Sequence, residues 1–253
     1  MKPKKIGITG RKENSLARLF AQKAIAILES KGIAVEIDSA FLPRSKGKTL
    51  SKFSCDLVLS FGGDGTLLSV YRELAKKIPV MGINCGSVGF LQAYKNTELE
   101  EATEAIASGK FAIEKRTRVA AKIDGKIAGE ALNEALLVPA KAGRILKYRL
   151  AINGHERDEA GDGLIVATPT GSTAHALSAG GPIVKGNANV FVVVSINPVN
   201  WQHRPLIIND HEKVRAYAFQ KINAELILDG QTRFPIKKMV ELSKGSEVLL
   251  ATK

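Results

Sequence analysis

The sequence has few cysteines and aromatic residues, and it lacks long apolar runs. Its two cysteines, Cys55 and Cys85, are too few for a disulfide framework, and neither belongs to a CxxC pattern or a Cys/His cluster. Aromatic residues make up 6% of the 253 positions, which argues against a surface that stacks nucleic-acid bases. Because no apolar run reaches the length of a signal-peptide core or a membrane span, we expect a cytoplasmic protein with no membrane partner.

Positive charge exceeds negative charge in this chain. Lysine and arginine total 37 against 25 for aspartate and glutamate, a formal net charge of +12. The cations are scattered rather than collected in blocks, and no aromatic platform accompanies them. We therefore expect a solvated surface that favours nucleotide phosphates, and no nucleic-acid partner. The length is sufficient for two modest domains.

The first part of the chain predicts alternating strands and helices. Strands are expected at 6–8, 33–37, 57–61 and 79–83, and helices at 15–30 and after Thr66. The pattern Thr97-Glu98-Leu99-Glu100 predicts a capping box that opens another helix, which ends near Gly109. This alternation predicts a Rossmann-like parallel sheet with helices on its faces, and ligands at the carboxyl ends of its strands.

After residue 95 the hydrophobic pattern takes the period of strands. Turn signals at Asp124-Gly125, Asn153-Gly154 and Asp229-Gly230 separate the strand-like runs. We expect strands at 111–123, 126–138, 145–153, 190–196, 213–218, 223–228 and 247–251. The prediction is thus an α/β fold in two domains, a Rossmann-like nucleotide-binding domain at 1–95 and a β-rich, β-sandwich-like dinucleotide-binding domain at 96–253.

The stretch GGDGT at 62–66 lies between an expected strand and an expected helix. Its glycines let the backbone approach phosphate groups closely, and Asp64 projects into that approach. Since a carboxylate repels phosphate, Asp64 indicates Mg²⁺ binding or proton abstraction rather than simple anion capture. The alternative is a tight turn in which Asp64 only caps the helix.

A second run, rich in small and hydroxyl-bearing residues, lies in the β-rich part. It reads GDGLIVATPTGSTAH at 161–175, followed by SAGGPI at 178–183. Unhindered amides and Ser/Thr hydroxyls suit a polar ligand. Because few core elements are this rich in glycine, serine and threonine, we expect this run to bind a ligand.

Together these stretches resemble the NAD kinase family, which phosphorylates the adenosine-ribose 2′-hydroxyl of NAD to make NADP. The resemblance spans most of the chain, in the family's order. It rests on GGDGT at 62–66, Asn133-Glu134, Gly161-Asp162-Gly163, TPTGSTA at 168–174, SAGGP at 178–182, Arg204-Pro205 and Asp229-Gly230-Gln231. GGDGT alone is shared with lipid kinases, whereas its combination with Asn-Glu and TPTGSTA is highly specific.

The resemblance implies a role for each matching residue. Asp64 would be catalytic and remove the proton of the 2′-hydroxyl, while Asn133 and Glu134 would hold the adenine and ribose groups of NAD. Asp162 would contact the dinucleotide from a neighbouring subunit, and Phe90 matches the family's pocket phenylalanine. The other expected nucleotide-binding residues are Gly62, Gly63, Gly65, Thr66, Thr170, Thr173, Ala174, His175, Ser178 and Gln231. No residue is assigned as a metal ligand.

The resemblance also implies the cofactors and the assembly. The chain has no GxxxxGK[ST], so Mg²⁺ or another divalent cation bound to ATP, backbone amides and scattered Lys/Arg side chains would neutralise the phosphates. A site completed by a neighbour's Asp162 implies a homodimer or homotetramer. The residues leave open whether ATP or polyphosphate is the donor, whether NAD or NADH is the acceptor, and whether NADP or NADPH regulates the reaction.

Two segments depart from the family pattern. His175 stands where the family usually has tyrosine, and an imidazole stacks on a base with less apolar area than a phenol and titrates near pH 6.5. The segment 195–203 also reads differently, which leaves the roles of Asn197, Trp201 and His203 open.

Three other functions compete with this one. Lipid kinases follow the glycine loop with a PxGTxNDFA-like stretch, whereas residues 79–90 read PVMGINCGSVGF. A phosphofructokinase would carry a TxDxD-like acid cluster, which this sequence lacks. A non-catalytic dinucleotide sensor would not need Asp64 in an intact glycine loop.

Overall fold

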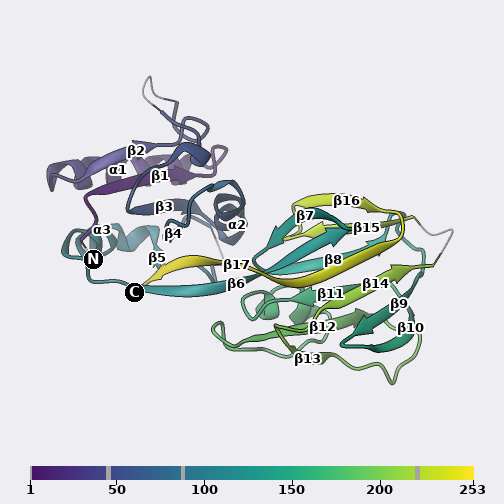
Figure 1. The fold of residues 1–253 in the computed structure, drawn as a ribbon. Coiled ribbons are helices and arrows are strands. Elements are labelled where there is room, and N and C mark those ends of the chain that lie inside the picture. The colour runs from purple at the N-terminus through teal and green to yellow at the C-terminus, as the bar shows by residue number, and fades with distance from the viewer. Residues whose placement is uncertain (1, 44–46, 87–88, 220–222) are drawn as a thin grey trace. The chain divides into compact units, whose positions relative to one another are not determined.

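The computed structural model describes residues 2–43, 47–86, 89–219 and 223–253, and it divides into two compact units (Figure 1). Unit 1 comprises residues 1–115 and 248–253, and unit 2 comprises residues 116–247. Two long strands, β6 (Ala112–Ile123) and β17 (Met239–Thr252), belong partly to each unit.

Unit 1 is built on a parallel sheet, which confirms the predicted fold of this part. The strand order is β2-β1-β3-β4, with β5 and the end of β17 pairing in parallel with β4. The strands are β1 (Lys5–Gly10), β2 (Ala34–Ile37), β3 (Leu57–Gly62), β4 (Val80–Asn84) and β5 (Tyr94–Lys95). The helices are α1 (Ser15–Ser30), α2 (Asp64–Glu73) and α3 (Leu99–Ser108). A short 3₁₀ turn, η1 (Leu50–Lys52), precedes β3.

Helix α1 buries one stripe against this sheet. Ala17, Ala21, Ala24 and Leu28 are fully buried at helical spacing and share a core with Ile8 and neighbouring strand residues. The Asn14 side chain caps the helix by accepting from Ala17 N (3.0 Å), and it donates to the Cys85 carbonyl just after β4 (3.1 Å). The start of α1 is therefore fixed to the end of β4.

Helix α3 differs from its prediction in two respects. It begins after the 3₁₀ turn η2 (Asn96–Glu98), where the Glu98 carboxylate accepts from Lys95 N (2.7 Å). The predicted capping box from Thr97 to Glu100 is therefore wrong, because the bond at this turn runs from Lys95 N to the Glu98 carboxylate, two residues earlier. Gly109, with φ of 72°, ends α3 as expected. Helix α3 packs on α1 within unit 1, whereas the expected domain boundary after residue 95 placed it in the second domain.

Unit 2 contains two sheets with a shared core, which confirms the predicted β-rich fold. One sheet runs β10-β9-β14-β17, and β6 pairs with both β17 and β7. The other is antiparallel in the order β13-β12-β11-β8-β15-β16. The bounds are β7 (Lys126–Ala131), β8 (Glu134–Pro139), β9 (Leu146–Ile152), β10 (His155–Gly161), β11 (Gly163–Ala167), β12 (Val190–Ile196), β13 (Leu206–Asn209), β14 (Val214–Ala218), β15 (Ala224–Leu228) and β16 (Thr232–Ile236).

The packing of these sheets positions the second glycine-rich run. Tyr148 and Val214 of one sheet meet Leu137 and Val193 of the other in one buried cluster. The opposite face of the β11–β12 sheet is covered by the 3₁₀ turn η3 (Gly171–Thr173) and the short helix α4 (His175–Ser178), with Ala176 buried on it. The part of the run at 168–178 therefore follows β11 and folds back over its sheet.

The expected strand at 126–138 is wrong as a single element. The structure has two strands there, β7 and β8, separated at Leu132-Asn133. The expected strand at 247–251 is part of the much longer β17. Strands β5, β10, β13 and β16 were not predicted.

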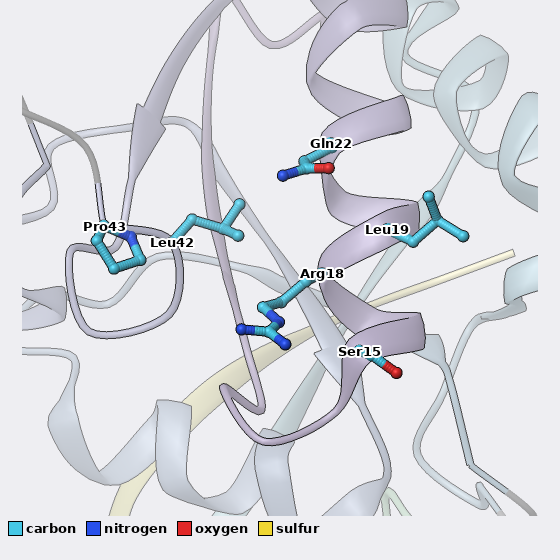
Figure 2. A pocket seen from close by; sticks show the side chains of 6 residues that line it. All are labelled: Ser15, Arg18, Leu19, Gln22, Leu42 and Pro43. Atoms are coloured by element: carbon cyan, nitrogen blue, oxygen red, sulfur yellow. The ribbon is translucent and has the colours of Figure 1, made fainter.

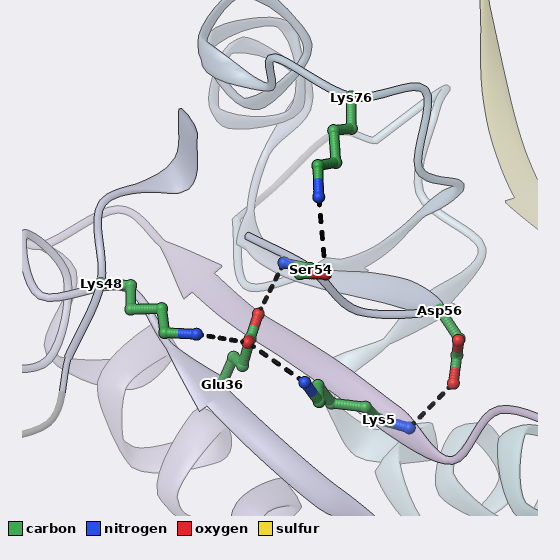
Figure 3. Close-up of polar contacts among 6 residues, drawn as sticks. All are labelled: Lys5, Glu36, Lys48, Ser54, Asp56 and Lys76. Carbon is green, nitrogen blue, oxygen red and sulfur yellow. Dashed lines mark hydrogen bonds and ion pairs between the residues drawn. The ribbon is translucent and has the colours of Figure 1, made fainter. Parts of the chain in front are cut away.

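A buried glutamate of β2 joins this strand to β1 and to the segment between β2 and β3 (Figure 3). The Glu36 carboxylate accepts from Lys48 Nζ (2.7 Å), Ser54 N (2.8 Å) and Lys5 Nζ (3.4 Å). Burial alone would raise the pKa of Glu36, but these donors and positive charges outweigh it and hold the pKa below its usual value. The ionised carboxylate therefore stabilises the folded unit.

We expect Glu36→Gln to lower the free energy of unfolding by about 1 to 2 kcal/mol at pH 7, because both lysines are partly screened by solvent. The pKa of Glu36 is lower in the folded state, so this contribution is present above pH 4.5 and is lost as the pH falls through the folded-state pKa. Urea unfolding of both proteins from pH 3 to 8 measures the difference. Glu104→Gln is the control, since the Glu104–Lys31 pair is exposed. A constant difference across this pH range would contradict the assignment.

Among the described residues, no helix is long and apolar enough to span a membrane. Cys55 and Cys85 are both free thiols, as expected, and burial raises the pKa of each to about 11. Neither thiol is therefore ionised at neutral pH.

Candidate functional site

The GGDGT loop lies at the carboxyl end of β3, where the parallel sheet was expected to place its ligands. Gly62 is the last residue of β3, and α2 begins at Asp64. A Cβ on Gly62 would lie 2.7 Å from the Thr66 Cβ, so only glycine lets the first turn of α2 pack this closely on the strand. The helix cap is Gly63, with no side-chain capping bond, so the alternative role of Asp64 as the cap is wrong.

The Asp64 carboxylate binds the segment that follows β4. Its Oδ2 accepts from Phe90 N (2.9 Å), and its Oδ1 accepts from Leu91 N (3.1 Å) and from Gln92 Nε2 (3.1 Å). A carboxylate has about four acceptor positions, so about one stays available. Gln92 in turn packs closely on β4, since a Cβ on Gly82 would lie only 2.7 Å from the Gln92 Cδ.

This arrangement brings together the predicted residues of unit 1. Gly62, Gly63, Gly65, Thr66 and Asp64 share one strand-to-helix turn, and Phe90 is attached to it through its backbone. The Phe90 side chain is 72% exposed, which is unusual for phenylalanine and leaves the ring available to a ligand. Ser87 and Val88, within the stretch that carried Phe90 in the sequence, lie outside the described residues.

In unit 2 the TPTGSTA run packs directly on Asn133. Thr168 N donates to the Asn133 carbonyl (2.9 Å), and a Cβ on Gly171 would lie 2.7 Å from the Asn133 Cα. Ser172 Oγ fixes the turn by donating to the Pro169 carbonyl (2.7 Å) and accepting from Val184 N (3.0 Å). Two motifs that lie far apart in the sequence thus form one backbone-to-backbone contact.

Glu134 follows Asn133 and points into a buried environment. It is 6% exposed, and within the described part of the chain its Oε2 has no hydrogen-bond partner. Burial raises the pKa of Glu134 to about 7, with a further contribution from the negative charge of Asp229. An unsatisfied buried carboxyl of this kind is a strong candidate for ligand binding.

The other predicted residues of unit 2 differ in burial and in their hydrogen bonds. Thr170 is buried, Thr173 donates weakly to the Thr170 carbonyl (3.4 Å), and Ala174 is half-buried. His175 and Ser178 are exposed on α4. Gln231 lies in the turn between β15 and β16, where its N donates to the Leu228 carbonyl (3.0 Å). Asp229, which begins this turn, was matched only as part of the family pattern and given no role.

Asp162 lies apart from these residues within one chain. It precedes β11, whereas Thr168 follows β11, so the strand separates them by roughly 20 Å. Its carboxylate is exposed and accepts from Asn197 Nδ2 (2.8 Å). Asp162 therefore does not join the Asn133–Glu134 group of its own chain.

The segment 195–203 has a structural role at His203. Glu159, whose side chain is fully buried, contacts His203 Nδ1 (2.8 Å) and accepts from Arg157 Nε (2.7 Å). Trp201 is 72% exposed. His203 thus fixes the segment to β10, while Asn197 contacts Asp162.

Two surface cavities do not include the predicted residues. One, of about 370 Å³, lies between α1 and the segment after β2 and is lined by Ser15, Arg18, Leu19, Gln22, Leu42 and Pro43. Figure 2 shows Arg18 and Gln22 extending from α1 toward the side of Leu42 and Pro43. The other, of about 680 Å³, lies beside β9 and β14 and includes Asn153, His211, Lys213 and Arg215. Neither offers a buried polar group like Glu134.

Comparisons with known proteins match both parts of the chain. The ATP-NAD kinase N-terminal domain matches residues 8–111, and the ATP-NAD kinase C-terminal domain matches residues 132–249. An NAD kinase of Methanopyrus kandleri is 32% identical, over 98% of this chain and 91% of that protein. The crystal structure of an NAD kinase from Archaeoglobus fulgidus in complex with ATP has a TM-score of 0.80 at 25% identity, covering 97% of this chain and 92% of that one.

A second solved structure supports the fold. Yeast NADH kinase complexed with NADH has a TM-score of 0.88 at 22% identity, covering 99% of this chain and 83% of that one. With both family domains matched in order and a relative aligned over almost the whole chain, the predicted family and the predicted phosphotransferase activity on NAD are confirmed. This chain belongs to the NAD kinase family.

Proposed function

We propose that this member of the NAD kinase family transfers the terminal phosphoryl group of ATP to the 2′-hydroxyl of the adenosine ribose of NAD, giving ADP and NADP. The observation that carries the proposal is the Asp64 carboxylate at the carboxyl end of β3, held by three N–H donors with about one acceptor position left. The ATP bound to the Archaeoglobus fulgidus kinase supports ATP as the donor.

Asp64 would accept the proton of the 2′-hydroxyl at its remaining position. The surrounding N–H groups restrict the carboxylate to one orientation, and orientation contributes much of the rate in phosphoryl transfer. The glycine backbone and the first amides of α2 suit the phosphates of the donor.

Mg²⁺ would enter as part of the substrate, bound to the ATP phosphates. The described residues contain no group of three or more His, Cys, Asp or Glu side chains that could hold a metal ion. Mg²⁺ usually binds substrate phosphates and waters together with one or two carboxylates rather than an all-protein site. The ion would neutralise charge that develops on the transferred group.

Unit 2 would hold NAD. Asn133 and Glu134 would bind the adenine and ribose, and Thr170, Thr173, Ala174, His175, Ser178 and Gln231 would surround the dinucleotide. Asp162 would act on a neighbouring subunit, since β11 separates it from the Asn133–Glu134 group of its own chain. A homodimer or homotetramer is therefore part of the proposal. Two free thiols favour a reducing, cytoplasmic location.

The test is an assay of the purified chain with NAD, ATP and Mg²⁺ that measures NADP by chromatography. NADP formation supports the proposal. Phosphatidate formed from diacylglycerol instead would favour a lipid kinase, and tight NAD binding without product would favour a sensor. Parallel reactions with polyphosphate and with NADH identify the donor and acceptor, and light scattering measures the oligomer.

A further inference from the structure

The start of β8 is shaped by a residue almost a hundred positions away. The Asp229 carboxylate accepts from Leu132 N (2.9 Å), Asn133 N (2.7 Å) and Glu134 N (3.3 Å). The Asp229 N donates to the Glu134 carbonyl (3.0 Å). These bonds lie where the strand-like run 126–138 is interrupted, so Asp229 satisfies the amides that leave the sheet between β7 and β8.

We infer that Asp229 is a positioning residue for the reaction, which holds the Asn133–Glu134 backbone in the shape that binds NAD and sets the charge of Glu134. The inference rests on the proposed function only in naming NAD as the ligand. Asp229 itself lies at φ of 51°, in the left-handed region, as the first residue of an Asp-Gly turn. The turn aims its carboxylate back at β8, and Gly230 completes it at φ of 67°.

Asp229 is also the charged group that acts on Glu134. The strand partner of Glu134 on β11 is Ala167, and the adjacent positions Asn133, Ala135 and Thr168 are also uncharged. On β15, Leu228 pairs with Ala135 and carries no charge either. Burial and then Asp229 raise the pKa of Glu134 to about 7. A ribose hydroxyl donates to the ionised carboxylate, so NAD affinity should rise with pH through about 7.

The experiment uses the whole enzyme and the variant Asp229→Asn. The amide retains one acceptor but turns an NH₂ toward backbone N–H groups, so we expect the dissociation constant for NAD to rise about tenfold or more. Because the negative charge is gone, we also expect the pH midpoint of NAD binding to fall by roughly half a unit or more. Calorimetric titration with NAD from pH 5.5 to 8.5 measures both quantities.

The chain offers a matched control in Asp124. It also starts an Asp-Gly turn, at φ of 50°, and its Oδ1 accepts from Lys238 N (3.1 Å) and Met239 N (2.9 Å). Asp124→Asn should cost stability without moving the pH midpoint. If the pH midpoint of NAD binding is the same in Asp229→Asn and Asp124→Asn, the inference is overturned, because an aspartate with a purely structural role would not change this midpoint.

Two further measurements keep the inference testable on its own. If Asp229→Asn does not fold, Asp229→Ser, which retains a hydroxyl acceptor, is titrated in its place. The carboxyl carbon of Glu134, followed by NMR without any ligand, should titrate near pH 7 in the parent and lower in the variant. If the parent chain shows no NAD kinase activity but Asp229→Asn still shifts the titration of Glu134, only the proposed function is contradicted. If the parent chain is active and Asp229→Asn leaves the titration of Glu134 unchanged, only the inference is overturned.

Discussion

The Asp64→Asn variant is expected to lose most of its turnover, with kcat for NADP formation falling by about 10²- to 10⁴-fold. An amide cannot accept the 2′-hydroxyl proton. The variant also has one acceptor oxygen instead of two, so its NH₂ group must face Phe90 N or Leu91 N, which are donors themselves. Steady-state kinetics with NAD, ATP and Mg²⁺ measures the loss, and calorimetry measures NAD binding, which should be largely kept.

Gln92→Leu separates the two roles of Asp64. This variant keeps the carboxylate and its two backbone donors but removes the third donor, Gln92 Nε2. If proton acceptance is the main role of Asp64, kcat of Gln92→Leu should fall by less than about tenfold, because this variant only loosens the segment 90–92. Full kcat in Asp64→Asn would remove Asp64 from the reaction. Equal losses in both variants would mean that the carboxylate acts only by holding residues 90–92.

The sequence was sufficient to predict the elements of both units that have regular apolar patterns. Helix α1 and strands β1 to β4 have strong hydrophobic periods, since their apolar faces are buried on the sheet. The same holds for β9, β12, β14 and β15, which pair on both sides. These elements could be predicted because each one buries an apolar face, which leaves a regular hydrophobic pattern in the sequence.

The strands that escaped prediction are at the edges of their sheets. β10 ends one sheet, and β13 and β16 end the other. β10 reads HERDEAG, and β16 contains Pro235, which is tolerated on an edge because no neighbour needs its N–H. Charges and proline on an edge prevent pairing with another chain, and in β10 and β16 they also remove the alternation that would reveal a strand.

The sequence could predict which residues belong to the candidate site, but it could not predict which groups these residues contact. GGDGT, Asn-Glu and TPTGSTA were visible as motifs, whereas the three donors to Asp64 come from residues 90–92, after another strand. The role of Asp229 was invisible because its partners are about a hundred residues earlier. An Asp-Gly pair predicts a turn. Which backbone amides the aspartate accepts from depends on the tertiary fold.

The Gly171→Ala variant should show the second large effect, a fall of about 10²-fold in kcat/KM for NAD. Gly171 does not have a positive φ, so its need for glycine is one of space. A Cβ there would overlap the Asn133 carbonyl and lie 2.7 Å from the Asn133 Cα, and backbone atoms on both sides must move. Such overpacking costs about 1 to 3 kcal/mol of stability and displaces Asn133 and Glu134 together.

Gly186→Ala is the matched control for this prediction. Gly186 is also crowded, but the three atoms nearest to a Cβ there all belong to the guanidinium of Arg116, the end of a flexible side chain rather than backbone. Its stability should change by less than about 1 kcal/mol, and kcat/KM for NAD should stay within about twofold. Thermal unfolding measures the stability of both variants, and steady-state kinetics measures their KM and kcat/KM for NAD. If Gly171→Ala keeps the parent's KM for NAD, the contact between TPTGSTA and Asn133 stabilises the fold without shaping the dinucleotide site. If KM rises while Gly186→Ala is unaffected, this backbone contact sets the geometry in which Asn133 and Glu134 meet the ligand.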